Sequence, residues 1–378
     1  MTIVWTAVAV VGSLVVLEVL ARAWIRARDE YRVWRPGHRL HMHTDRAVLP
    51  SQEALVRFDV NSEGERGSEP PRDAAGTYRI LVAGGSAAEC YFLDQPSTWP
   101  EVMKRELSQP DGLAWLRAAH VHVGSIGRSL VSTESIDEVL SRVLPRYRKL
   151  DAIVFMIGAA NVANWLAKGA PATIEEKPPA PGLLFDLHPL GPFGWRPGAT
   201  AIAEIVRRLR AKHLRALELR HGAGARLAKA REMRRNAKTV LTETPDPAVM
   251  LDHFEMRFRE MLENVRKRVP RVIVVRQPWF RKDRYAPEEL ATFWHGAAGN
   301  PYTGVVATYY SFEVVSRLVD LVDRRVAAVC DEAGVQQADL MPLLEPSLAT
   351  FYDFWHFTPA GGAVVGKAVA KAVLERPR

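Results

Sequence analysis

The sequence predicts an α/β protein built on a three-layer, doubly wound parallel sheet, with a basic helical insertion and an N-terminal transmembrane helix. Three observations lead to this prediction. Short apolar segments typical of buried strands alternate with helical segments from Tyr78 onward. This alternation stops between about residues 168 and 246, where proline, glycine and then arginine accumulate. Residues 2–24 are almost wholly apolar. Strands that alternate with helices indicate a parallel sheet covered on both faces.

The expected elements follow one another as a βα repeat. Apolar runs bounded by glycine, proline or aspartate predict strands at residues 78–84, 121–127, 151–158, 271–278 and 335–340. Apolar residues at helical spacing predict helices at residues 97–107, 134–144, 312–334 and 359–374. Ligands of such sheets bind at the carboxyl ends of the strands. Side chains that directly follow the strands are therefore the candidates for chemistry.

Residues 2–24, TIVWTAVAVVGSLVVLEVLARAW, match one bilayer span, which needs about 20 apolar residues. An interfacial collar of arginine and tryptophan follows: Arg22, Trp24, Arg26, Arg28, Arg32, Trp34 and Arg35. A cleaved signal peptide is the alternative, although Met1–Trp5 lacks the usual basic residues. A buried helix of a soluble protein is the third interpretation. We expect an uncleaved single-pass membrane anchor over residues 1–35. The arginines favour a cytoplasmic body, a bias that does not fix the side.

Two further regions complete the domain organisation. Residues 36–77 are rich in glycine, proline and charge, and are expected to form a linker and an irregular lead-in. Residues 78–378 are expected to form one domain that contains the insertion at about 168–246. The later part of that insertion is helical in pattern and very basic. Such a helix is either a solvated surface element, or a lid or membrane-facing arm.

Charge and cysteine content narrow the class of function. The formal net charge is +8, from 51 lysines and arginines against 43 aspartates and glutamates. This excess favours acidic surfaces, but the sequence has no Walker loop, zinc-type cysteine spacing or RNA-binding signature. We therefore expect no nucleic-acid partner. The only cysteines are Cys90 and Cys330, too few for a disulfide framework.

The first strand of the predicted sheet runs into two glycines and a serine, in RILVAGGS at residues 79–86. A tight strand-to-helix turn explains the glycines by itself. A nucleophile held above the carboxyl edge of the sheet explains the serine as well. That role needs a base, a group that orients the base, and donors for the developing oxyanion.

The segment FYDFWHFTPAGG near the carboxyl end offers the base and its orienting group. Asp353 and His356 lie three residues apart, just before the last predicted helix. On a turn this spacing puts both side chains on one side, so the carboxylate can reach the imidazole. A lone histidine at such a place is more often a cap or a core residue. The pairing with Asp353 and with Ser86 favours catalysis.

These segments resemble the four blocks of the SGNH, or GDSL-type, hydrolases, a superfamily of esterases, lipases and acetyltransferases with a flavodoxin-like fold. The matching segments, in order, are GGSAAE, VHVGSIGRSL, MIGAAN and DFWH. The resemblance implies Ser86 as nucleophile, His356 as base and Asp353 as its orienter. It also implies backbone oxyanion donors at Ser86 and at Gly127 or Leu130. Gly127 ranks first because glycine permits close approach.

The third block departs from the family pattern. It usually reads G-x-N-D, and the asparagine side chain helps to hold the oxyanion. Here Ala160 occupies the asparagine position and Asn161 the next one. Either a loop shift lets Asn161 serve as donor, or the side-chain donor is missing. In the second case Asn161 is expected to cap a helix that begins near Val162. Leu130 is a second departure, because family members often carry glycine there.

Aromatic residues near the predicted sheet edge are the candidate pocket residues. Trp279 follows the strand at 271–278, and Trp294 and His295 lie in the segment FWHG. Core packing is an equally good interpretation of Trp279. His295 competes with His356 as base, but no aspartate precedes it by three residues.

The sequence thus predicts a membrane-anchored serine esterase that acts on an O-acyl group of a glycan or a lipid. An O-acyltransferase to a sugar hydroxyl is one alternative. A non-catalytic SGNH-like protein that binds a glycan or lipid is another, and the Ala160 position supports it. The resemblance implies no metal and no organic cofactor. The expected partners are the acylated substrate and the membrane.

Overall fold

A five-stranded parallel sheet forms the centre of the computed structural model, which describes residues 1–175, 179–191, 193–220 and 223–375, with the backbone alone at 211–220. The strand order is β4-β3-β5-β7-β9. Every neighbouring pair is parallel. The strands are β3 (Thr77–Gly84), β4 (His120–Ser125), β5 (Ala152–Ile157), β7 (Arg271–Arg276) and β9 (Gln336–Asp339). The α/β class and the parallel sheet are confirmed.

The strand order fixes where a ligand would bind. From β3 the chain moves outward to β4 and then crosses back over β3 to β5. The winding direction therefore reverses between β3 and β5. In doubly wound sheets this switch point opens a crevice beyond the carboxyl ends of the two strands. Gly84 and Ile157 are the last residues of those strands.

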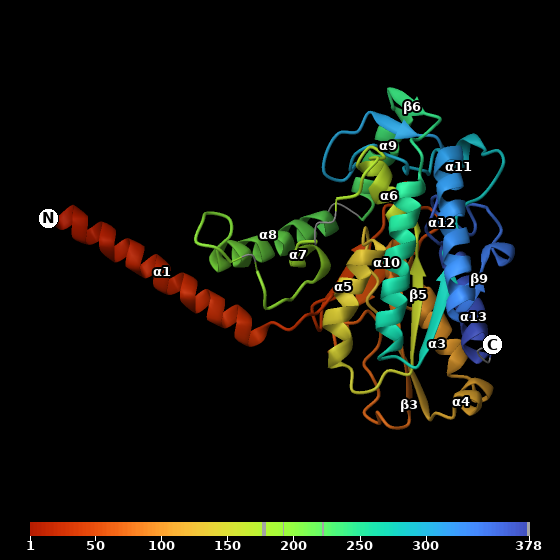
Figure 1. Ribbon diagram of the computed structural model, residues 1–378, viewed down its shortest axis with the longest axis horizontal. Helices are drawn as coiled ribbons and strands as arrows, with labels where there is room; N and C mark the ends of the chain where they lie inside the picture. Colours follow the sequence, from red (N-terminus) through yellow and green to blue (C-terminus); the bar gives the residue numbers. More distant parts are fainter. Residues whose placement is uncertain (176–178, 192, 221–222, 376–378) are drawn as a thin grey trace.

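Helices cover the sheet. One layer contains α5 (Thr133–Val143), α10 (Ala248–Arg266) and α12 (Phe312–Ala333), with α10 packed between the other two (Figure 1). The other contains α3 (Trp99–Leu107) and α13 (Pro359–Leu374), which pack on each other. Right-handed crossovers put the two layers on opposite faces. At Gly366 of α13 an added Cβ would lie 2.5 Å from Val102 Cβ, so this contact requires glycine.

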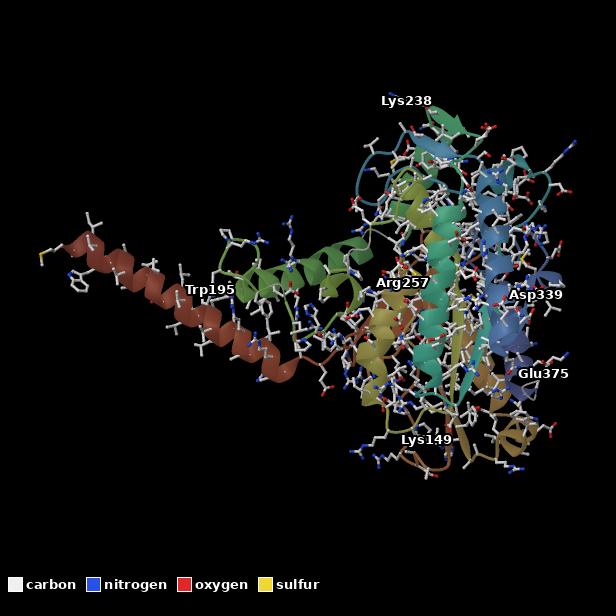
Figure 2. The ribbon with its side chains drawn as sticks, in the orientation of Figure 1. Lys149, Trp195, Lys238, Arg257, Asp339 and Glu375 are labelled. Carbon is white, nitrogen blue, oxygen red and sulfur yellow. The ribbon has the colours of Figure 1, made fainter. Side chains whose placement is uncertain are left out.

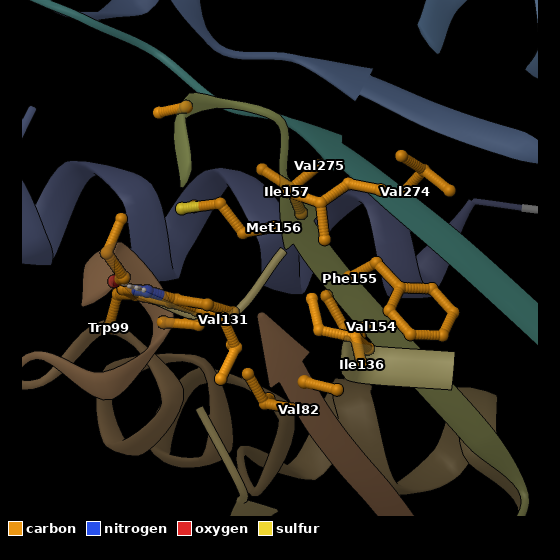
Figure 3. Close-up of a cluster of buried hydrophobic side chains, with 14 of the residues drawn as sticks. Val82, Trp99, Val131, Ile136, Val154, Phe155, Met156, Ile157, Val274 and Val275 are labelled. Carbon is orange, nitrogen blue, oxygen red and sulfur yellow. Dashed lines mark hydrogen bonds between the residues drawn. The ribbon is translucent and has the colours of Figure 1, made fainter. Parts of the chain in front are cut away.

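The core lies between the sheet and these layers. All six residues of β5 are buried, because this strand is central in the sheet. Figure 3 shows Val154, Phe155, Met156 and Ile157 of β5 among buried side chains from β3, β7 and α5. Burial on both faces explains why the strands read as continuous apolar runs.

The remaining elements surround the sheet. The additional helices are α2 (Ser86–Glu89), α4 (Pro110–Leu116), α6 (Ala159–Ala167), α7 (Pro181–Leu184), α8 (Ala201–Arg220), α9 (Ala225–Arg235) and α11 (Pro287–Leu290). Short 3₁₀ turns occur at Gln95–Ser97, Leu144–Arg146 and Met341–Leu343. Two strands, β6 (Thr239–Leu241) and β8 (Thr308–Tyr310), pair in parallel as a separate ribbon. The insertion at about 168–246 thus carries α7, α8, α9 and β6.

Residues 36–77 differ from the expected linker. They contain an antiparallel hairpin of β1 (Arg39–His43) and β2 (Leu55–Asp59). Alternate residues of the hairpin are buried and belong to the main hydrophobic core: Leu40, Met42, Val56 and Phe58. The alternation of polar and apolar residues in RLHMH and LVRFD is the pattern of half-buried strands, so the expectation of a linker was wrong.

The first helix, α1 (Thr2–Arg28), extends away from the body (Figure 1). It is long and apolar enough to cross a membrane, with a mean hydropathy of 2.4 over its most apolar stretch. Only Glu18 and Ile25 of this helix are buried. The body therefore does not supply the apolar surroundings that such a helix requires.

Candidate active site

Ser86 lies at the switch point, at the first position of α2. β3 ends at Gly84, where an added Cβ would lie 2.2 Å from the carbonyl oxygen of Met156 in β5. Only glycine lets the two strands stay this close as the chain turns. Gly84 is thus explained by packing against β5, whereas an added Cβ at Gly85 would lie 3.7 Å from Ala160 Cβ, an ordinary contact. The serine at the start of α2 is not explained by that packing.

Ser86, His356 and Asp353 form one hydrogen-bonded chain. The Ser86 Oγ lies 2.7 Å from His356 Nε2. On the other side of the ring, His356 Nδ1 lies 2.8 Å from Asp353 Oδ1 and 2.9 Å from Oδ2. The serine and the histidine are 270 residues apart in the chain. The fold thus brings together the nucleophile and the pair expected from the sequence.

Asp353 is buried and held in its charged form. It is 1% exposed, and its Oδ1 accepts the backbone N–H groups of Trp355 and His356, each at 2.9 Å. Burial alone would raise the pKa of the Asp353 carboxyl. The charges of His356 and His295, together with these hydrogen bonds, instead hold that pKa well below its usual range. The carboxylate is therefore ready to orient the imidazole.

Trp294 and His295 reach the same carboxylate from the segment before β8. The Trp294 indole N–H donates to Asp353 Oδ2 over 3.1 Å. His295 is 1% exposed, and its Nε2 lies 3.9 Å from Asp353 Oδ2. Burial lowers the pKa of His295 to about 3, against the opposing effect of the Asp353 charge. His295 is therefore neutral at ordinary pH. Among the described residues, no hydrogen bond joins His295 to Ser86.

Two residues that the sequence reasoning missed hold the loop of Asp353 and His356. The Tyr352 ring stacks on the His356 ring, with centroids 5.5 Å apart and planes at 13°. Arg231 of α9 donates to the carbonyl oxygens of Tyr352 at 3.0 Å and Thr292 at 2.8 Å, and also to that of Val48. The basic insertion and the lead-in thus support the site. Tyr352 could have been inferred from the sequence, because it directly precedes Asp353. Arg231 could not, because nothing in the sequence distinguishes it from the many arginines around it.

The three expected backbone donors differ in availability. The Ser86 N–H has no acceptor inside α2, because it is the first residue of that helix. The Gly127 N–H already donates to Ser125 Oγ at 3.2 Å. An added Cβ at Gly127 would lie 2.5 Å from the Glu89 nitrogen, so its glycine serves packing against α2. Both the N–H of Gly127 and its lack of a Cβ are therefore accounted for within the fold.

Leu130 is the residue of the second block whose backbone N–H stays without an acceptor in the described chain. Its φ is +65°, in the left-handed region that favours glycine. The loop is fixed on both sides of it, because Ser129 Oγ donates to Glu89 of α2 and Asn164 Nδ2 donates to the Leu130 carbonyl at 3.1 Å.

Asn161 binds a helix other than the one expected. Helix α6 begins at Ala159 rather than near Val162, so Asn161 lies inside its first turn. Its Oδ1 accepts the backbone N–H of Thr133 at 3.2 Å and the Thr133 hydroxyl at 3.0 Å. Thr133 is the first residue of α5. The expected cap of its own helix is thus wrong, and within the described chain the Nδ2 of Asn161 has no acceptor.

Trp279 belongs to the core. It is 1% exposed, and its indole N–H donates to Ser316 of α12 at 3.0 Å. A side chain buried this fully does not line an open pocket. Trp294 is only half-buried, and its ring also contacts Tyr302 edge-on at 5.0 Å.

His295, Asp353 and His356 also offer ligand atoms within 4.8 Å of one another, as a metal centre would. Both ring nitrogens of His356 are engaged, however, one with Ser86 and one with Asp353. The arrangement therefore fits a serine–histidine–aspartate chain better than a metal site.

Comparison with known proteins gives no family assignment. No protein-family model matches the sequence, and no curated protein matches it. Among solved structures, the acetylxylan esterase Axe2 from Geobacillus stearothermophilus overlaps with a TM-score of 0.42 at 13% identity, covering 80% of this chain and 97% of that one. A catalytic mutant of Axe2 gives 0.42 at 12% identity over the same shares. Likeness at this level decides neither family nor activity.

Proposed function

We propose that this chain is a serine esterase of the SGNH type, in which Ser86, His356 and Asp353 act as the catalytic triad. The observation that carries the proposal is the 2.7 Å separation between Ser86 Oγ and His356 Nε2, with Asp353 bonded to the opposite nitrogen. A serine needs such a base to become a nucleophile, and the base needs such a partner to keep its orientation.

The reaction follows from this geometry. Ser86 Oγ attacks the carbonyl carbon of an ester while His356 Nε2 takes the hydroxyl proton. His356 then gives that proton to the departing alcohol as the carbon–oxygen bond breaks. Water attacks the acyl-enzyme by the same route in reverse, releasing the acid and restoring Ser86. Asp353 stays charged throughout and stabilises the imidazolium.

Oxyanion stabilisation is assigned to groups around Ser86. The backbone N–H of Ser86 and that of Leu130 are the main-chain donors, and the Asn161 amide is the side-chain donor. The contact with Thr133 holds the oxygen of this amide and leaves its nitrogen available. Donors of this kind typically contribute on the order of 10² to 10³ in rate.

The substrate is proposed to be an O-acyl ester of a glycan or a lipid. An apolar wall beside His356 supports this class, because it suits an acyl chain or a sugar face. Its partly buried members come from three parts of the chain and pack against the buried Leu49, Leu227 and Tyr352: Val48, Phe92 and Trp294. We further propose that α1 anchors the chain in a membrane, as its hydropathy and exposure favour.

The test is hydrolysis of p-nitrophenyl acetate by the purified full chain in detergent. Ser86→Ala and His356→Ala should each lower turnover by several orders of magnitude, without loss of the folded state. Ser141→Ala, at an exposed serine of α5, is the matched control and should turn over as the wild type does. Equal turnover by the wild type and Ser86→Ala would contradict the triad. A folded wild type inert toward short and long esters would favour the binding-only alternative.

A further inference from the structure

The membrane helix α1 is fastened to the start of α8 through a buried carboxylate. Glu18, the one acidic residue between Thr2 and Arg28, is 3% exposed. Its two carboxylate oxygens accept the backbone N–H groups of Ala201 at 2.7 Å and Ile202 at 3.1 Å. Arg22, one turn further along α1, donates to the same carboxylate at 2.7 Å. The first residues of α8 are thus held beside Glu18 of α1.

Further contacts extend this attachment along α1. Arg22 donates to the Gly194 carbonyl at 2.7 Å, and its guanidinium lies 4.4 Å above the Trp195 ring. Figure 2 shows Trp195 beside α1 near the start of α8. At the end of α1, Asp29 forms an ion pair with Arg208. Residues 193–210 therefore run alongside residues 18–29, and these two segments are named here the collar surface.

The height of the collar surface follows from helix geometry. About 20 helical residues at 1.5 Å each cross the roughly 30 Å hydrocarbon core of a bilayer. If α1 crosses with its most apolar residues, which begin at Thr2, residues after about position 21 lie at the level of the lipid headgroups. The collar surface then lies at that level too. This step rests on the membrane anchor proposed above and not on the triad.

The composition of the collar surface matches a boundary between lipid and water. Its two segments contain seven arginines against three acidic residues. The acids are Glu18, Asp29 and Glu204, and all three are buried and paired with arginines. Exposed apolar side chains and exposed arginines share the remaining surface: Trp24, Arg26, Arg28, Trp195, Arg196, Val206, Leu209 and Arg210. The collar surface therefore presents both positive charge and apolar side chains to its surroundings.

We propose that the collar surface binds the anionic phospholipid headgroups of the leaflet from which α1 emerges. The arginines meet the lipid phosphates and carboxylates. Trp195, beside Arg22, enters the acyl boundary, and Val206 and Leu209, next to the Arg208–Asp29 ion pair, lie among the headgroups. Basic segments next to a membrane helix are attracted to an anionic bilayer surface by each of their cations. The insertion thereby has a second role besides supporting the loop of Asp353: it holds the body at a fixed height above the membrane.

The test uses an environment-sensitive NBD fluorophore on single introduced cysteines of the full chain in lipid nanodiscs. The two native cysteines, Cys90 and Cys330, are buried, so the unsubstituted chain measures background labelling. Val206→Cys reports on the collar surface, and Leu14→Cys reports on the middle of α1. Leu343→Cys is the matched control, because it is equally exposed at 57% and follows Asp339, which lies far from α1 in Figure 2.

The outcomes distinguish the lipid-binding proposal for the collar surface from the proposal that α1 is a membrane anchor. With phosphatidylglycerol in the nanodisc, the label at position 206 should emit at shorter wavelength than the label at 343. The shift should shrink in pure phosphatidylcholine, or when Arg196→Gln and Arg210→Gln are combined. Water-like emission at 206 in both lipids, with a buried label at 14, would overturn the collar proposal alone. Water-like emission at 14 would overturn the anchor and the collar proposal together.

Discussion

Trp294 donates its indole N–H to Asp353 Oδ2 over 3.1 Å, from a segment 59 residues earlier in the chain. The sequence predicts Trp294 only as a candidate pocket residue. The contact makes it a positioning residue instead, because it fixes the second oxygen of the carboxylate that orients His356.

Trp294→Phe should therefore lower kcat while leaving KM nearly unchanged. The substitution keeps an aromatic ring and removes one hydrogen bond to a charged group. Such bonds contribute about 1.5–3 kcal/mol, which corresponds to a loss of tenfold or more in rate. Trp279→Phe is the matched control, since its indole bonds Ser316 in the core. Steady-state kinetics of both variants checks this, and an equal loss in both would point to a general packing effect.

Asn161 offers a pair of substitutions that separates two roles. Asn161→Asp keeps an oxygen for Thr133 and loses the amide donor, whereas Asn161→Ala loses both. We expect both variants to lose about 10²-fold in turnover. We expect only the alanine variant to lose stability, by about 1 kcal/mol, as helix α5 loses its cap. Ester turnover and urea unfolding give the two readings, and wild-type turnover in Asn161→Asp would exclude the donor role.

His295 should make the folded chain sensitive to acid. Its pKa is lowered by burial from 6.5 to about 3 in the folded state. The unfolded chain therefore binds a proton that the folded chain excludes between these two values. Its contribution to stability is complete above pH 6.5 and is lost as the pH falls toward 3. The slope is about 1.4 kcal/mol per pH unit.

Urea unfolding of the wild type and His295→Phe at several pH values between 7 and 4 measures this slope. The wild type should lose stability faster than the variant as the pH falls. His41→Phe, at an exposed histidine of β1, should behave as the wild type does. Parallel curves for wild type and His295→Phe would show that His295 titrates normally.

The parallel sheet was predictable because burial on both faces leaves continuous apolar runs in the sequence. The predicted strand at 151–158 lies within one residue of β5 at each end. The hairpin β1–β2 was missed although its short strands alternate polar and buried apolar residues, because glycine, proline and charge dominate the surrounding segment. Helix α10 (Ala248–Arg266) was also missed, although its buried residues recur at helical spacing.

Within the site, the sequence predicted the three residues that we propose as the triad and missed the residues that hold their loop. Ser86, Asp353 and His356 follow recognisable local patterns. Arg231 does not, because its role depends on three carbonyl oxygens that the fold brings together from Val48, Thr292 and Tyr352. The contact of Asn161 with Thr133 likewise joins two helices that are 28 residues apart in sequence. Spacing within one segment cannot reveal such contacts.

Whether Ser86 is an activated nucleophile can be measured with a fluorophosphonate probe. The probe reacts covalently with activated serines and requires no knowledge of the natural ester. We expect that the full chain is labelled and that mass spectrometry places the adduct on Ser86. We expect Ser86→Ala and His356→Ala to abolish labelling, and Ser141→Ala to leave it unchanged. A folded wild-type chain that stays unlabelled, or an adduct on another serine, would contradict an activated nucleophile at Ser86.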